Sequence, residues 1–171
     1  MLRISSNLSG LAGVVAAGAI ALSLQSPAQA QAAFGSYVGA GAAVGLSDDD
    51  NGDGDGVSFV ISGRYNILEL PISIRGQAFL LGDGSAFVPT VSYDYPLNFQ
   101  TNVYVGAGIS LPSGGEPSPV GDQVSFVIQP GVDYFLPGSN LVVFGNAVFA
   151  LNGFSDGGTA TSVQGGVGVQ F

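Results

Sequence analysis

From Tyr37 to Phe171, apolar and polar residues alternate with a period of two, and no helical periodicity interrupts the pattern. A period of two places successive side chains on opposite faces of a β-strand. The segment 57–67 shows this most clearly, because Phe59 and its apolar companions fall on one face and Arg64 falls with the serines on the other. The alternation predicts an all-β fold.

Eight segments carry the pattern, and we expect strands at 37–46, 57–67, 72–81, 87–95, 99–109, 123–135, 141–152 and 161–171. The connections alternate between loops of 9, 4, 10 and 6 residues and turns of 3, 3 and 5 residues. Longer loops at one end and short turns at the other are typical of a membrane-spanning β-barrel. The sequence therefore predicts an eight-stranded antiparallel transmembrane β-barrel.

The composition of the polar face of these strands indicates that this face points into the barrel. It consists mainly of Ser, Thr, Asn, Gln and Gly, and charged residues make up only 9% of the chain. The water-facing side of a soluble β-sandwich would carry Lys and Glu, and this chain has no Lys. A lipid-facing Arg or Lys at the bilayer midplane costs about 2–4 kcal/mol, which favours an uncharged outer face. A secreted soluble β-sandwich stays as the alternative fold.

Aromatic residues gather near the strand ends, as expected for two interfacial girdles. The predicted girdle at the short-turn end comprises Tyr37, Tyr65, Tyr93, Tyr95, Phe99, Tyr134, Phe135 and Phe171, and the one at the loop end comprises Phe59, Phe87, Phe126 and Phe149.

Some residues fit the barrel less simply. Pro89 and Pro130 fall inside predicted strands and cannot donate to the ladder, so we expect a bulge or a local break at each. A slip of the 141–152 strand by one residue is an open alternative. Several bulky apolar residues fall on the inner face, namely Val60, Val88, Val127, Val142, Phe144 and Val148.

The N-terminal segment has the features of a secretory signal peptide. Arg3 supplies a positive charge, 11–24 is an uncharged run, and Ala28 and Ala30 form a small-x-small cleavage signal. The run is shorter than the roughly 20 residues of a transmembrane helix, although a membrane-anchoring helix is the alternative interpretation. We predict a signal peptide at 1–30, cleaved after Ala30, and a barrel domain at 31–171.

Four charged residues lie deep in the predicted strands, all on the inner face and all toward the short-turn end: Arg64, Arg75, Asp94 and Asp133. Charges inside a narrow barrel must be paired or hydrated. We therefore predict a charge network in the lumen. It would serve either as a structural plug that fixes strand register or as a gate or selectivity ring.

The most acidic stretch, 48–56, resembles the first half of a calcium-binding loop. Alternating oxygen ligands followed by Gly suit a hard cation such as Ca²⁺. The bidentate Glu of that motif is missing, because Val60 occupies its position. A solvated acidic loop is the simpler interpretation. The candidate ligands are Asp49, Asn51, Asp53 and Asp55.

The composition also excludes function classes. The chain has no Cys and no His, which removes thiolate nucleophiles, Cys-ligated zinc and the commonest general base. A formal charge of −9 disfavours nucleic acid as a partner. No nucleophile or paired-carboxylate constellation is evident, so we expect a protein without catalytic activity.

The signal peptide, the eight alternating strands and the last segment make the chain resemble the small eight-stranded outer-membrane barrels of the OmpA/OmpX-like group. The resemblance implies a monomer in the outer membrane that contacts its lipid and lipopolysaccharide. It also implies that Val167, Val169 and Phe171 form the C-terminal signal that the barrel-assembly machinery reads. The lipid-modifying enzymes of that group rely on His, which this chain lacks. The expected function is structural or interactive, through surface loops; a narrow porin-like channel for ions or small solutes is the alternative.

Overall fold

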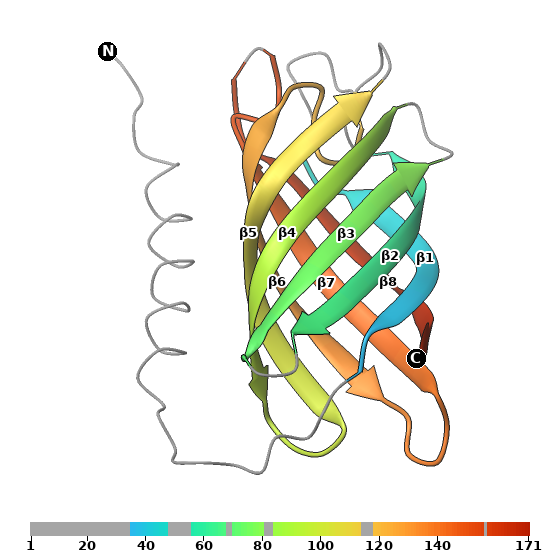
Figure 1. Cartoon of the computed structure of the whole chain (residues 1–171). Helices are drawn as coiled ribbons and strands as arrows, with labels where there is room; N and C mark the ends of the chain where they lie inside the picture. The colour runs from blue at the N-terminus through green and yellow to red at the C-terminus, as the bar shows by residue number, and fades with distance from the viewer. Residues whose placement is uncertain (1–34, 48–55, 68–69, 81–83, 114–117, 156) are drawn as a thin grey trace. The chain divides into compact units, whose positions relative to one another are not determined.

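The computed structural model describes residues 35–47, 56–67, 70–80, 84–113, 118–155 and 157–171. The chain divides into two units, 1–31 and 32–171, and all described residues belong to the second. They form eight antiparallel strands in a closed barrel, in which each strand pairs with the next and β8 pairs with β1 (Figure 1). The strands are β1 (Tyr37–Gly45), β2 (Val57–Ile67), β3 (Ile72–Leu80), β4 (Ser85–Pro96), β5 (Thr101–Ser113), β6 (Ser125–Phe135), β7 (Leu141–Leu151) and β8 (Ala160–Gln170).

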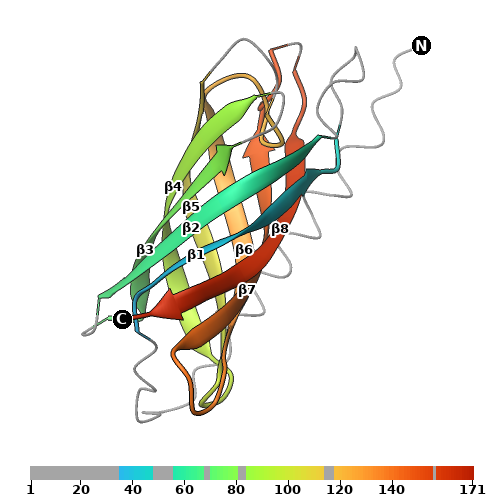
Figure 2. The same ribbon diagram turned by 90° about the vertical axis from the view of Figure 1, so that its right-hand side faces the viewer.

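The closed ladder confirms the predicted architecture and excludes the soluble sandwich. Outward positions carry exposed apolar side chains, such as Val91 at 56% and Val167 at 52%, whereas polar side chains such as Gln129 point inward at 1%. Figure 2, turned by 90°, shows β1 and β8 side by side where the barrel closes. No helix among the described residues is long and apolar enough to cross a membrane.

The inward side chains form three layers along the barrel axis. Near the loop end lies an apolar layer that includes Val60, Phe79 and Val127, all fully buried. The middle layer is made of carboxamides and hydroxyls, and the third layer, toward the short turns, contains the buried charges. The bulky apolar residues that were predicted on the inner face are all buried there. The register of β7 is not slipped, because Asn146 and Phe144 both face inward.

The two strand prolines break the ladder without a bulge. Pairing between β4 and β5 stops after Phe87 and resumes at Thr90, with the same register on both sides of Pro89. Pairing between β6 and β7 is interrupted in the same way around Pro130. Each proline stays paired with its other neighbouring strand, Pro89 with Gly76 on β3 and Pro130 with Val105 on β5. The missing N–H donor therefore leaves only a local gap in the ladder.

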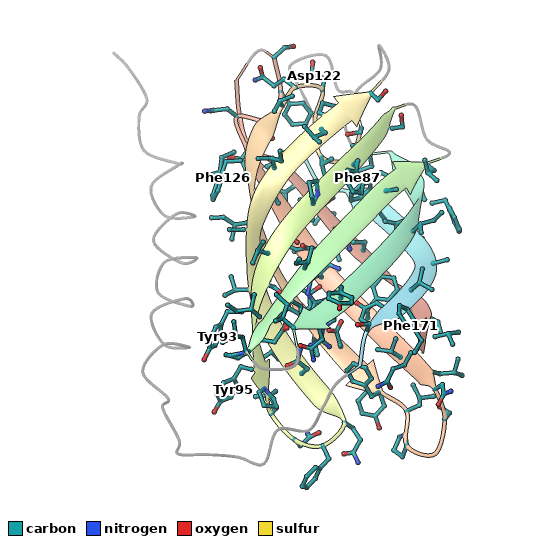
Figure 3. All side chains as sticks on the ribbon, in the orientation of Figure 1. Phe87, Tyr93, Tyr95, Asp122, Phe126 and Phe171 are labelled. Atoms are coloured by element: carbon teal, nitrogen blue, oxygen red, sulfur yellow. The ribbon has the colours of Figure 1, made fainter. Side chains whose placement is uncertain are left out.

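Two members of the predicted short-turn girdle lie inside the barrel and not on its lipid-facing surface. Tyr37 and Phe135 point inward, at 2% and 8% exposure, whereas Tyr65 and Phe99 face outward. The prediction failed for Tyr37 because both faces of β1 carry small residues, so the alternation does not show which face of this strand points inward. Phe135 shares its parity with Asp133, so the alternation already assigned it to the lumen. At this end Tyr93, Tyr95 and Phe171 lie on the outside (Figure 3).

Candidate functional site

The four predicted lumen charges come from four strands and meet near the short-turn end. Arg64 on β2 and Arg75 on β3 are direct partners in the ladder. Asp94 projects from β4 and Asp133 from β6. All four are at most 6% exposed. We call these four residues the ionic cluster.

Each arginine in the ionic cluster contacts both aspartates. Arg75 Nη2 lies 2.8 Å from Asp133 Oδ2 and 3.0 Å from Asp94 Oδ1. Arg64 Nη2 lies 3.1 Å from Asp94 Oδ2, and its Nη1 lies 3.5 Å from Asp133 Oδ2. Two cations and two carboxylates balance, so no net charge is left in the low-dielectric interior.

Hydroxyl groups complete the shell around the carboxylates. The Tyr37 hydroxyl donates to Asp133 Oδ1 at 3.0 Å, which ties β1 to β6 across the lumen. The Ser92 hydroxyl donates to Asp94 Oδ1 at 3.1 Å, and that of Ser73 donates to Asp94 Oδ2. Buried carboxylates satisfied in this way are held in one orientation.

The ring of Tyr104 packs against Arg75 of the ionic cluster. The guanidinium carbon of Arg75 lies 3.3 Å from the centre of the Tyr104 ring, a cation–π contact. Gly131 makes room for this ring, because a Cβ at position 131 would lie 2.4 Å from Tyr104 Cζ. The glycine on β6 therefore permits the packing of the aromatic ring from β5.

The middle layer is a belt of hydrogen-bonded carboxamides. Thr90 Oγ1 donates to Gln129 Oε1 at 2.7 Å, and Gln129 Nε2 donates to Asn146 Oδ1 at 3.1 Å. Gln164 Nε2 donates to Gln77 Oε1 at 3.1 Å. This belt separates the ionic cluster from the apolar layer.

The β5–β6 and β7–β8 connections contact each other at the loop end. Asp122 accepts hydrogen bonds from the backbone N–H and the hydroxyl of Ser155, each at 2.7 Å. Val120 and Phe154, one from each connection, are 0% and 2% exposed and belong to the buried apolar cluster. Side chains from these connections thus extend the apolar layer.

The outward apolar surface, the closed ladder and the inward polar groups match a known class of membrane protein. A family model described as the outer membrane protein beta-barrel domain matches residues 14–171. The chain belongs to this family.

Solved structures of other outer-membrane barrels share the fold. The N-terminal β-barrel domain of Pseudomonas aeruginosa OprF is 11% identical, with a TM-score of 0.56, 80% of this chain covered and 96% of that one. Neisserial surface protein A is 21% identical, with a TM-score of 0.52 and coverages of 80% and 97%. Yersinia pestis Ail, in a bilayer nanodisc, is 16% identical, with a TM-score of 0.53 and coverages of 80% and 99%. A search of curated proteins finds no match.

The remaining predicted site residues are the candidate Ca²⁺ ligands and the C-terminal assembly signal. Asp49, Asn51, Asp53 and Asp55, the candidate Ca²⁺ ligands, lie outside the described residues. In the part of the chain that the structure describes, no group of acidic residues is arranged to hold a metal. Val167, Val169 and Phe171 all face outward, at 52%, 53% and 78% exposure.

Besides Tyr37, sequence reasoning missed two groups of residues at this site. Tyr104 has the same parity as Asn102 on its strand, so the alternation could have placed it inward. The carboxamides of the middle layer were recognised as inward but not as partners of one another. Their contacts depend on register between strands distant in sequence, which one sequence does not reveal.

Proposed function

We propose that this outer-membrane barrel is a closed, non-catalytic scaffold that presents its loop end to the exterior and conducts neither ions nor solutes. The observation that carries the proposal is the burial of the ionic cluster, whose four side chains are 6% exposed or less. An eight-stranded interior is narrow enough to be filled by side chains. The apolar layer is a second barrier to ions and solutes along the barrel axis, because Val60, Val88 and Val148 have no exposed surface.

Planar-bilayer recordings test this proposal against the narrow-channel alternative. We expect no discrete conductance steps from the purified barrel at either polarity, with a porin in the same bilayer as the positive control. Arg75→Ala should also remain closed, because the apolar layer is intact in that variant. Reproducible steps from the wild-type barrel would contradict the scaffold function.

The loop end does not suit polyanionic ligands. Ail has been crystallised with the heparin analogue sucrose octasulfate. This chain has three Arg and no Lys, and two of those arginines are buried in the ionic cluster. Sulfate and phosphate recognition relies on accessible Arg or Lys. Surface partners of this barrel are therefore expected to be uncharged or cationic.

The route to the membrane and the acidic loop belong to the same proposal. Residues 1–30 act as a cleaved signal peptide, and the assembly machinery reads Val167, Val169 and Phe171. The mature barrel is a monomer surrounded by outer-membrane lipid. The acidic loop that carries Asp49, Asn51, Asp53 and Asp55 is solvated at the cell surface, and Ca²⁺ binding by these residues, with a bridge to lipopolysaccharide, is the alternative. Mass analysis of the mature N-terminus and Ca²⁺ titration of the refolded barrel test these points separately.

A further inference from the structure

Two hollows on the outer wall share the side chain of Phe126. The first, which we call the wall groove, has a volume of about 460 Å³ and is lined mainly by apolar side chains of β3 to β6. The second, the rim pocket, has a volume of about 820 Å³ and lies where β6 begins and β7 ends. Phe126 lines both hollows and projects away from the wall in the loop half of the barrel (Figure 3). The two hollows therefore adjoin each other at this side chain.

The wall groove exists because a small residue lies between larger ones. Ala107 on β5 faces outward and pairs with Val91 on β4 and with Ile128 on β6. The groove runs from Phe126 toward Tyr93, and these two residues are 51% and 50% exposed. On a membrane barrel this surface opens to the hydrocarbon of the bilayer, so an acyl chain is the occupant that it fits.

The rim pocket combines this apolar edge with uncharged polar groups. Gln123 Nε2 is engaged by the backbone oxygens of Asn152 and Phe154 at 2.8 and 2.6 Å. The Gln123 carboxamide oxygen and the Asn152 carboxamide have no hydrogen-bond partner among the described residues. They line the pocket beside Ser155 and the ring of Phe126. Amide groups next to an aromatic ring suit a ligand rich in hydroxyls.

The charge near the pocket excludes an anionic head group. The carboxylate of Asp122 lies beside the pocket, hydrogen-bonded to Ser155. Arg64 and Arg75, the only cations among the described residues, are both buried in the lumen. A phosphate in the rim pocket would meet a carboxylate and no compensating cation.

We propose that the rim pocket and the wall groove together bind one glycolipid with an uncharged sugar head. The head lies in the rim pocket against Asn152, and one acyl chain lies along Ala107 in the wall groove. The acyl chain is surrounded by hydrocarbon both before and after binding, so its burial in the groove adds little hydrophobic free energy to the association. Selectivity therefore depends on the head group and hardly on chain length.

Native mass spectrometry of the full barrel, released from bilayers of defined composition, tests this proposal. The probes are a monoglycosyl diacylglycerol and a phosphatidylglycerol with the same acyl chains. We expect one glycolipid retained per barrel with at least tenfold preference over phosphatidylglycerol. Shortening both acyl chains by two carbons should change the preference less than twofold.

Three variants separate the site from unspecific lipid retention. Ala107→Phe fills the groove and should abolish retention of the single glycolipid. Asn152→Gly keeps the left-handed backbone that Asn152 adopts, at φ 54°, and should reduce the head-group preference at least fivefold. Ala40→Phe adds the same ring to an exposed position on β1, outside both hollows, and should change nothing. Equal retention of both lipids by the wild-type barrel, or undiminished binding by Ala107→Phe, would overturn the proposal.

Discussion

Arg64 and Arg75 stand directly opposite each other in the β2–β3 ladder, and the same two carboxylates, Asp94 and Asp133, contact both. Like charges in directly opposed positions destabilise a sheet unless they are compensated. Here the compensation comes from β4 and β6. The pairing of β2 with β3 is therefore coupled to two strands that come later in the chain.

Removing one member of the ionic cluster should destabilise the barrel strongly. We expect Arg75→Ala and Asp133→Ala each to lower the free energy of unfolding by about 3–5 kcal/mol, because each leaves a buried charge uncompensated. The double variant should lose less than the sum of the two losses. Urea unfolding in lipid vesicles measures all three, and strictly additive losses would show that the two side chains are not coupled.

The Tyr37 hydroxyl should contribute to stability through Asp133. Tyr37→Phe removes one hydrogen bond to a buried carboxylate, which we expect to cost about 1.5–3 kcal/mol. Tyr65→Phe is the matched control, because Tyr65 is 62% exposed on the outer face. If both variants unfold at the same urea concentration as the wild type, the link between β1 and β6 has no energetic weight.

Gly131 and Gly145 offer a matched pair of substitutions. A Cβ at Gly131 would overlap the Tyr104 ring, whereas a Cβ at Gly145 meets only Gln164 O at 3.8 Å. Gly131→Ala should cost about 1–3 kcal/mol through overpacking. Gly145→Ala should be neutral or should stabilise by about 0.5–1 kcal/mol, since Gly is unfavourable in strands. A reversed order in the unfolding midpoints would refute the assigned packing of Tyr104.

The contact between Asp122 and Ser155 should hold the two loop-end connections together. Asp122→Ala removes two exposed hydrogen bonds, and we expect local opening to become easier by about 0.5–1.5 kcal/mol. Proteinase K cleavage between β5 and β6 should be faster, because cleavage follows the population of the open form. Ser155→Ala should accelerate it less, since the backbone N–H of residue 155 still donates. Identical cleavage rates in all three proteins would argue against this contact.

The sequence predicted most of the fold because the barrel depends on a local pattern. The bounds of β2 agree at both ends, and Arg64, Arg75, Asp94 and Asp133 all face inward as the alternation required. The inward orientation of Tyr37 could not be predicted, because Gly39 and Ala40 leave the two faces of β1 alike. The hydrogen bond from Tyr37 to Asp133 spans 96 residues, and only strand register and barrel closure bring these groups together.

The closed lumen is the central claim, and a single introduced cysteine tests it most directly because the chain has none of its own. Ser62 lies in the middle layer at 4% exposure, whereas Ser139 is exposed in the turn between β6 and β7. A water-soluble thiol reagent added to both sides of the folded barrel should label Ser139→Cys fully and leave Ser62→Cys unmodified until the barrel is unfolded. Labelling of Ser62→Cys at the rate of Ser139→Cys would show a continuous water path and contradict the closed barrel.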